Sequence, residues 1–308
     1  MCWISRCGVN RRMDESPNQQ ISRSVNKVSV VIPAYNEERS IAEIVRRLRA
    51  VDDGFEVIVV DDGSSDATAA LAAEAGAQVV AHPYNIGNGA AVKTGVHQAS
   101  GDVVVLMDAD GQHDPSDIPT LLADIGPYDM VVGARTKESE VSAFRAFGNW
   151  GLVQVANYLA GMRIPDLTSG FRAIKRERMV EFLHLLPNTF SYPTTITLAL
   201  LKSGYPVKWV PLKSIKKREQ GESKIKPIRD GLRFVNIMLR VVMLFDPQKV
   251  FLPASGLLLV AGAMLIVYNV WATGGVQESS MLLIITGVFT FFFGLLAEQI
   301  AHLRREVK

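Results

Sequence analysis

Residues 103–115 read V-V-V-L-M-D-A-D-G-Q-H-D-P, and this stretch decides the fold. Its first half is apolar and rich in β-branched side chains, which is typical of a strand buried on both faces of a parallel sheet. The apolar run ends abruptly in carboxylates. The sequence therefore predicts that Asp108 and Asp110 lie at the carboxyl end of a strand, the edge at which open α/β sheets bind their ligands.

Asp108 and Asp110 are separated by one small residue, so a turn there can direct both carboxylates at one divalent cation. Gln112 offers a third oxygen ligand, and a cation held in this way could bind a diphosphate. We favour this metal site because neither aspartate has a helix end to cap.

The residues that follow are better explained as the start of a helix. Asp114 is predicted to be the N-cap, Pro115 to occupy the first helical position, and Asp117 to complete a capping-box-like pattern. The alternative for Asp108 and Asp110 is that they belong to the same capping loop and bind nothing.

Strand and helix patterns alternate on both sides of this stretch, which predicts an α/β fold with a mostly parallel sheet and right-handed crossovers. Further strands are expected near residues 27–32, 55–60, 77–81, 129–133 and 207–210. Helices are expected over residues 41–48, 90–99, 142–161 and 198–201, and one more helix is expected to end near residue 75. The polar loops after the strands would converge on one crevice.

The charge of the 308-residue chain is nearly balanced at +2, so nucleic acid is not indicated as a partner. Basic residues nevertheless gather in the last third, which points to a membrane surface. They are Lys213, Lys216, Lys217, Arg218, Lys224, Lys226, Arg229, Arg233 and Arg240.

Residues 1–26 contain both cysteines and no secretory signal, and we expect a mobile tail there.

The C-terminal part is predicted to enter the membrane. Residues 226–249 have the pattern of a basic amphipathic helix in the interface, and residues 250–308 that of a transmembrane hairpin with spans near 251–271 and 279–300. Basic residues flank the hairpin, whereas Glu278 is the only charge in its connecting loop. By the positive-inside rule both chain ends and the α/β domain are expected on the cytosolic side. A soluble core hairpin is the alternative.

Two nucleotide motifs are absent. Residues 87–92 superficially suggest a dinucleotide fingerprint, but Val92 stands where the third glycine belongs, and Lys93 lacks the glycine spacing of a Walker A loop. We therefore do not expect a nicotinamide cofactor. His82 is expected to be an ordinary loop residue, and His113 at most a neighbour of the acidic cluster.

Five short motifs occur in order: P-A-Y-N-E at 33–37, V-D-D-G-S-S-D at 60–66, D-A-D-G-Q-H at 108–113, S-G-F-R at 169–172 and G-E-S-K at 221–224. With them the sequence resembles glycosyltransferase family 2 with a GT-A fold, and more narrowly the polyprenyl-phosphate glycosyltransferases related to dolichyl-phosphate mannose synthase. The resemblance implies a catalytic domain over residues 27–225.

The resemblance also implies roles for individual residues. The nucleoside would be held by Pro33, Tyr35, Glu37 and Asp62, and Mg²⁺ or Mn²⁺ would be held by Asp108, Asp110 and Gln112. The acceptor phosphate would be bound by Arg135, Arg145 and Ser169. The site would be closed by Arg218, Ser223 and Lys224. Asp166 would orient the sugar or the attacking oxygen, or else cap a helix. Residues 191–195, S-Y-P-T-T, depart from the acidic pattern of many relatives, so the sugar is not specified.

The expected function is a metal-dependent, inverting transfer of one sugar from a GDP- or UDP-linked donor to a polyprenyl phosphate, beside a lipid bilayer. One alternative is an enzyme that extends a polysaccharide or glycolipid, although the Q-x-x-R-W motif of processive relatives is absent. Another is a catalytically silent membrane scaffold that binds nucleotide. Whether the chain forms a homo-oligomer stays open.

Overall fold

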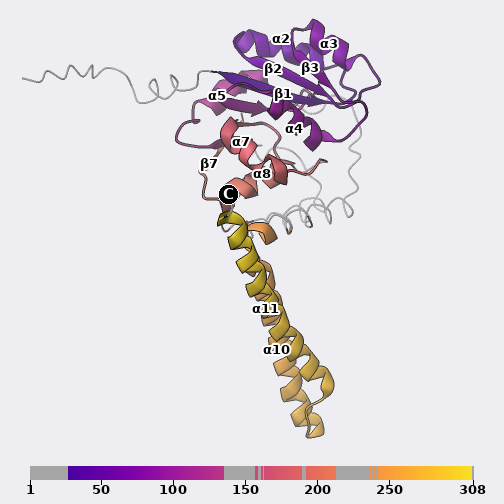
Figure 1. The fold of residues 1–308 in the computed structure, drawn as a ribbon, viewed down its shortest axis with the longest axis vertical. Helices are drawn as coiled ribbons and strands as arrows, with labels where there is room; N and C mark the ends of the chain where they lie inside the picture. Colours follow the sequence, from indigo (N-terminus) through magenta and orange to yellow (C-terminus); the bar gives the residue numbers. More distant parts are fainter. Residues whose placement is uncertain are drawn as a thin grey trace, which may run out of the picture.

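The computed structural model describes residues 27–134, 157–158, 161, 163–188, 192–212, 236, 239 and 242–306. The predicted tail over 1–26, the closing residues Arg218, Ser223 and Lys224, and most of both predicted amphipathic helices, 142–161 and 226–249, lie outside this part. The described chain forms a sheet domain and a long helical hairpin that extends from it (Figure 1).

In the described part of the chain, the sheet has seven strands in the order β3-β2-β1-β4-β6-β5-β7. Of these seven, β6 alone runs antiparallel to its neighbours, β4 and β5. The strands are β1 (Val28–Ala34), β2 (Glu56–Asp61), β3 (Gln78–Ala81), β4 (Val103–Leu106), β5 (Met130–Ala134), β6 (Arg172–Lys175) and β7 (Val207–Pro211). Each strand that the sequence predicted is present, and β4 is buried along its whole length.

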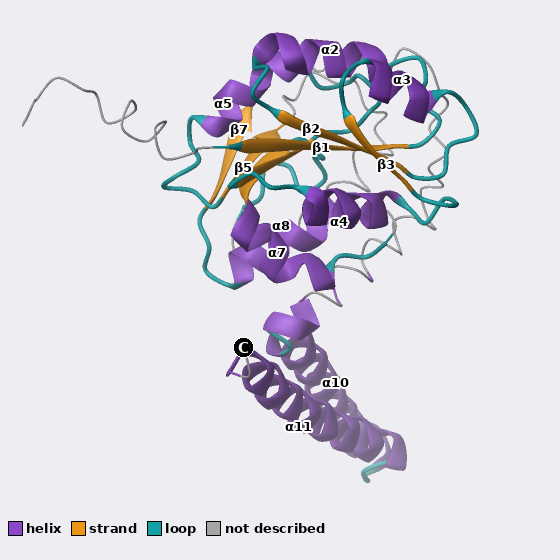
Figure 2. Cartoon of the chain, turned by 45° about the horizontal axis from the view of Figure 1, so that its top comes forward, coloured by secondary structure: helices purple, strands orange, loops and turns teal. Residues whose placement is uncertain are grey.

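Helices cover both faces of the sheet (Figure 2). On one face lie α2 (Ile41–Val51), α3 (Thr68–Glu74) and α5 (Ile118–Leu122), and on the other α4 (Asn88–Gln98), α7 (Arg176–Phe182) and α8 (Tyr192–Lys202). The periodic side chains that predicted α2, among them Ile44 and Leu48, are buried. Each face therefore has its own apolar core, and the central strands are buried between the two.

The hairpin consists of α10 (Gln248–Thr273) and α11 (Glu278–Glu306). At about 1.5 Å per residue, the 26 residues of α10 extend about 39 Å, which exceeds the roughly 30 Å of a bilayer core. Both helices are long and apolar enough to cross a membrane, and few of their side chains are buried within the protein. The predicted hairpin is therefore confirmed as a pair of candidate membrane spans.

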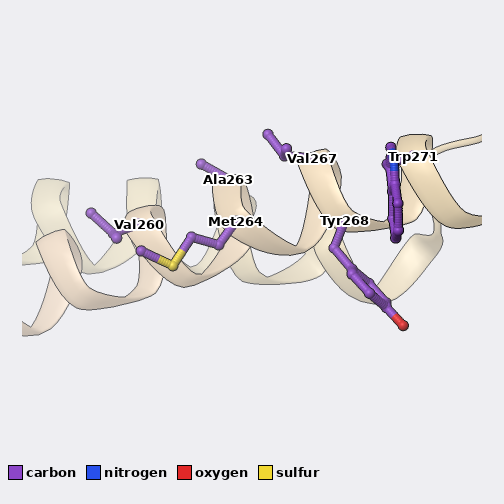
Figure 3. Close-up of a pocket in the computed structure, with 6 residues that line it drawn as sticks. All are labelled: Val260, Ala263, Met264, Val267, Tyr268 and Trp271. Carbon is purple, nitrogen blue, oxygen red and sulfur yellow. The ribbon is translucent and has the colours of Figure 1, made fainter.

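The outer face of α10 is lined by apolar side chains (Figure 3). Val260, Met264 and Val267 project from it, and Tyr268 and Trp271 follow near its end. Trp271 is 85% exposed. Hydrocarbon would cover the aliphatic part of this face, while tyrosine and tryptophan prefer the level of the headgroups. The surface therefore fits a membrane better than water.

Short contacts join the hairpin to the sheet domain. Lys202 at the end of α8 lies 2.9 Å from the Asp246 carboxylate, just before α10. Val242 and Phe245 are buried against the core beneath the sheet, and the Phe245 ring lies 6.4 Å from that of Phe182. The residues just before α10 are thus packed directly against α7 and α8.

Candidate active site

The acidic turn after β4 is held in place by backbone contacts. The Gln112 amide donates to Asp110 Oδ1 at 3.1 Å, and Ser40 donates its hydroxyl to the Ala109 carbonyl at 2.6 Å. Asp108 and Asp110 are both partly exposed, whereas Ala109 between them is buried. The turn therefore presents both carboxylates at the carboxyl edge of the sheet, as the sequence predicted for this stretch.

The helix start that follows has Asp114 and Pro115 at the predicted positions, and the capping-box role of Asp117 stays a prediction. Asp114 accepts a hydrogen bond from the Ser116 amide at 2.9 Å, and Pro115 opens the short helix η1 (Pro115–Asp117). Burial raises the pKa of Asp114, but bonds from Ser116 and Arg47 outweigh it and lower the pKa below its usual range. Asp114 is therefore a structural cap.

The loop before β6 lies directly against Asp108. A Cβ atom at Gly170 would lie 2.4 Å from Asp108 Oδ2. No real contact is that short, so only glycine fits here while the carboxylate keeps its position. The S-G-F-R motif is therefore joined to the acidic turn through space, although about sixty residues of sequence separate them.

Asp166 and Ser169 shape this loop from within. Asp166 Oδ1 accepts bonds from the amides of Thr168 at 2.9 Å and Ser169 at 3.1 Å. These amides belong to the loop that leads into β6, so the helix cap considered for Asp166 is not what the structure contains. Ser169 is fully buried and donates its hydroxyl to the Gly133 carbonyl at 2.6 Å. Its predicted contact with an acceptor phosphate stays a prediction and would require this bond to open.

The loops after β1 and β2 are bonded to each other. The Asn36 amide donates to Ser64 Oγ at 2.9 Å, and the Ser65 amide donates to Asn36 Oδ1 at 2.9 Å. Pro33 is buried in β1, whereas Tyr35 is 48% exposed at the end of that strand. The two loops therefore form one rim. Of the predicted nucleoside-binding residues, Tyr35 is the one most open to solvent.

Asp62 uses its oxygens within the protein. Oδ1 lies 2.7 Å from His82 Nδ1 and accepts from the Ile86 amide at 3.0 Å, while Oδ2 accepts from the Gly87 amide at 2.8 Å. The other ring nitrogen of His82 is 2.9 Å from Thr94 Oγ1. His82 is therefore an inner bridge between two loops and α4, not a plain loop residue. Nucleoside binding by Asp62 stays a prediction.

Gly63 lets the loop over residues 82–87 cross close to this rim. Its φ angle is +72°, and a Cβ atom there would lie 2.5 Å from the Tyr84 backbone. Larger residues would therefore push the loop away. Tyr84 itself is 67% exposed beside the rim.

Two residues at this edge have surroundings that the sequence did not indicate. The His113 ring is buried and stacks on Phe171 with 5.0 Å between ring centroids. Arg172, the last residue of S-G-F-R, is fully buried beneath the sheet. Its place in a motif was visible, but nothing in a single sequence indicated that the charge would be internal.

The donor set at the acidic turn fits a cation that also binds substrate. Asp108, Asp110 and Gln112 offer oxygen atoms, which suit Mg²⁺ or Mn²⁺. Within the described ranges no group of three or more His, Cys, Asp or Glu side chains forms a complete metal cage. Mg²⁺ commonly binds through one or two carboxylates, waters and substrate phosphates, so two carboxylates suffice. Arg135 and Arg145, predicted to bind the acceptor, lie outside the described residues.

Comparison with known families settles the class of protein. Residues 29–180 match Glycosyl transferase family 2, and residues 246–303 match the GtrB C-terminal hairpin. The chain belongs to glycosyl transferase family 2. It is a glycosyltransferase, and the resemblance found in its motifs is confirmed. The second match covers α10 and most of α11, so the hairpin is a recognised module of such proteins.

Relatives cover nearly the whole chain. An undecaprenyl-phosphate 4-deoxy-4-formamido-L-arabinose transferase of Pseudomonas fluorescens is 30% identical over 92% of this chain and 87% of its own length. The glycosyltransferase AglJ of Haloferax volcanii is 29% identical over 91% of this chain and 95% of its own. The similarity therefore includes the hairpin as well as the sheet domain.

A solved structure shares the fold of the sheet domain. Glucosyl-3-phosphoglycerate synthase of Mycobacterium tuberculosis, crystallised with Mn²⁺, UDP-glucose and phosphoglyceric acid, superposes with a TM-score of 0.58. It is 21% identical and covers 73% of this chain, against 82% of its own. The predicted GT-A-like architecture is thereby confirmed.

Proposed function

We propose that this glycosyltransferase moves a single sugar from a nucleotide-diphosphate sugar to a polyprenyl phosphate, in the presence of Mg²⁺ or Mn²⁺, at the cytosolic face of a membrane. The observation that carries the proposal is the pair Asp108 and Asp110 at the tip of β4, on the chain that also carries a membrane hairpin. Relatives named as undecaprenyl-phosphate transferases support the acceptor class.

The donor is proposed to lie along the rim made by the loops after β1, β2 and β3. Tyr35 and Glu37 would contact the nucleoside, while Asp62 holds the loop at 82–87 in place. When bound by Asp108, Asp110 and Gln112, the cation would neutralise the diphosphate as leaving group. The neighbour crystallised with Mn²⁺ and UDP-glucose supports this arrangement.

The acceptor needs little chemical activation. A lipid phosphate is already an anion near neutral pH, so one of its oxygens can attack the anomeric carbon without a general base. The new bond joins that carbon to the lipid phosphate, the bond to the donor diphosphate breaks, and its electron pair leaves with the nucleoside diphosphate. In-line attack inverts the anomeric centre. The protein must mainly hold two anions together, which is a task of positioning.

The hairpin supports the proposed position at the cytosolic face. Both ends of the hairpin lie next to the sheet domain, and its connecting loop lies at the far end (Figure 1). Lys249 lies in the first turn of α10 and Arg304 in the last turn of α11, whereas the loop between the two helices carries no Lys or Arg. By the positive-inside rule this distribution of charge supports the proposal that the sheet domain lies in the cytosol.

The proposal is tested with membranes that contain the full-length chain. We would supply labelled UDP- and GDP-sugars, a short polyprenyl phosphate and Mg²⁺ or Mn²⁺, and repeat each reaction with EDTA. The expected result is a chloroform-extractable product with inverted anomeric configuration, made only without EDTA. Polymeric product would favour a chain-extending enzyme instead. No product from any donor would favour a binding scaffold, and EDTA-resistant transfer would contradict the metal role.

A further inference from the structure

The residue that the proposed chemistry leaves unexplained is Arg172. Its side chain is fully buried at the start of β6, beneath the acidic turn. Its hydrogen bonds go to neutral atoms: Nη1 donates to the Pro193 carbonyl at 3.0 Å and to Thr197 Oγ1 at 3.0 Å, and Nη2 donates to the Ser169 carbonyl. Within the described residues no carboxylate forms an ion pair with it.

A buried cation of this kind is costly. Burial lowers the pKa of Arg172, and Tyr192, Asp166 and Asp108 act in the opposite direction without direct pairing. Even a buried ion pair can often be replaced by apolar side chains of similar volume with no loss of stability, and among the described residues Arg172 has no such pair. Stability alone therefore gives little reason for an arginine here. The position of Arg172 relative to the acidic turn gives a better reason.

The three oxygens that Arg172 binds connect two parts of the molecule. Ser169 belongs to the loop before β6, and its neighbour Gly170 lies so close to the Asp108 carboxylate that a Cβ atom there would be 2.4 Å from Oδ2. Pro193 and Thr197 lie in the first half of α8, in and just after the segment that departs from the pattern of many relatives. The loop is thus enclosed between α8 on one side and Asp108 on the other.

We propose that Arg172 is a positioning residue for sugar transfer: it clamps the loop over residues 166–170 to α8, and so fixes that loop against Asp108. This inference rests on the proposed function and deepens it. The planar guanidinium suits the task because its donors point in fixed directions toward several carbonyl oxygens at once, which a lysine ammonium does not match. The clamp acts through the loop and does not touch the reacting atoms.

The chain offers a matched control in Arg49. This side chain also donates to three oxygen atoms, the backbone carbonyls of Asp53 at 2.8 Å, Phe55 at 2.9 Å and Gly76 at 2.9 Å, and it lies 3.8 Å from the exposed Asp53 carboxylate. Those residues precede β2 and β3, at the opposite edge of the sheet from the acidic turn. Arg49→Met therefore removes the same kind of bonds without reaching the site.

The experiment compares Arg172→Met, Arg172→Lys and Arg49→Met in the full-length protein. Hydrogen exchange of residues 166–170 is measured first, because it needs no turnover. We expect both Arg172 variants to lose about tenfold or more of the protection of this loop, while Arg49→Met leaves it as in the wild type. Unchanged exchange in Arg172→Met, or an equal loss in Arg49→Met, would overturn the clamp.

Kinetics then separate positioning from a purely structural role. For Arg172→Met we expect kcat to fall about 10- to 100-fold and the KM for polyprenyl phosphate to rise, with the donor KM changed less than about threefold. Arg172→Lys should recover little of this activity. Wild-type kinetics in either Arg172 variant, or a full rescue by lysine, would count against the proposal.

A milder variant keeps the test decisive if the Arg172 variants do not fold. Thr197→Val preserves volume and removes one oxygen of the clamp; we expect faster loop exchange and a loss of acceptor use of about two- to fivefold. Wild-type behaviour of Thr197→Val in both measurements would overturn the proposal. If the wild-type enzyme transfers no sugar to polyprenyl phosphate, the proposed function fails, whereas loop exchange still decides whether the clamp exists.

Discussion

Carboxylates at the two edges of the sheet differ in how many hydrogen bonds they accept from the protein. At the amino edge, Glu56 accepts hydrogen bonds from the Ser29 hydroxyl at 2.5 Å, the Ser100 amide at 2.8 Å and the Ser100 hydroxyl at 2.7 Å, and Lys27 lies 3.4 Å away. At the carboxyl edge, Asp110 accepts a single bond within the described residues, from the Gln112 amide.

This difference shows how to distinguish a structural carboxylate from one that can bind a ligand. Glu56 joins the starts of three strands, and its oxygens have no capacity left for an external partner. Asp110 lies on a turn after β4, is partly exposed, and retains an oxygen that can bind a cation. Asp62 is an intermediate case, because it lies at the carboxyl edge but both of its oxygens bond to the loop over residues 82–87.

The largest expected effect comes from removing charge at the carboxyl edge. Asp110→Asn keeps an oxygen for the Gln112 amide but should lower sugar transfer at least about 1000-fold, because the cation loses an anionic ligand. Thermal unfolding in detergent should change little. Asp53→Asn, at a carboxylate that is 94% exposed, is the matched control and should keep full activity. Substantial transfer by Asp110→Asn would contradict the difference between the edges.

A smaller effect is expected when the carboxylate is moved but not removed. In Gly170→Ala the new methyl carbon would lie 2.4 Å from Asp108 Oδ2, which is too close, so the carboxylate must rotate or shift. We expect transfer to fall about 10- to 100-fold, since displacement by an ångström at a reacting centre has this order of effect.

The control for this substitution is Gly275→Ala in the hairpin loop, where a Cβ atom would meet nothing within 4 Å. It should leave transfer unchanged. Equal activity of Gly170→Ala and the wild type would show that the contact with Asp108 has no bearing on the reaction.

At the amino edge the effect should fall on stability instead of activity. Burial raises the pKa of Glu56, but hydrogen bonds from Ser29 and Ser100 and the charge of Lys27 outweigh it and lower the pKa from 4.5 to about 2. Ionised Glu56 therefore stabilises the fold above about pH 4.5, and this stabilisation is lost as the pH falls toward 2.

Glu56→Gln should thus lower the free energy of unfolding by about 1–3 kcal/mol at pH 7, the usual range for hydrogen bonds to a charged group. The difference from the wild type should shrink below pH 4.5, and kcat should stay the same. Chemical denaturation in detergent at a series of pH values measures it. A difference that is constant with pH would show that the charge of Glu56 is not the cause.

The smallest effect is expected at Lys27. Its side chain is 49% exposed, and its nitrogen lies 3.4 Å from Glu56. Exposed ion pairs contribute about 0–1 kcal/mol, so Lys27→Met should change stability by less than Glu56→Gln does. The same denaturation curves compare the two. A larger loss for Lys27→Met would mean that the ion pair, and not the serine hydrogen bonds, holds the amino edge together.

Much of the fold could be predicted because its signals are local. Apolar periodicity identified α2, the buried run identified β4, and the length of the uncharged segments identified the hairpin. The capping role of Asp114 followed from its position before Pro115. Each of these features depends on residues within one or two turns of the chain.

The structural features that could not be predicted from the sequence depend on contacts between distant segments. The antiparallel insertion of β6 between β4 and β5 is set by pairing across the sheet, as between Val105 and Ala173, and no local pattern reports it. The same holds for the bridge that His82 makes between Asp62 and Thr94, and for the burial of Arg172. These residues looked ordinary in sequence because their partners lie far along the chain.

The central claim is that the carboxylates at the tip of β4 bind the divalent cation used in transfer. It is tested most directly by Mn²⁺ titration of the full-length protein, followed by electron paramagnetic resonance in the presence of UDP or GDP. We predict one tightly bound ion per wild-type chain and an affinity about 100-fold lower in Asp110→Asn. Equal Mn²⁺ affinity in the two proteins would contradict the account.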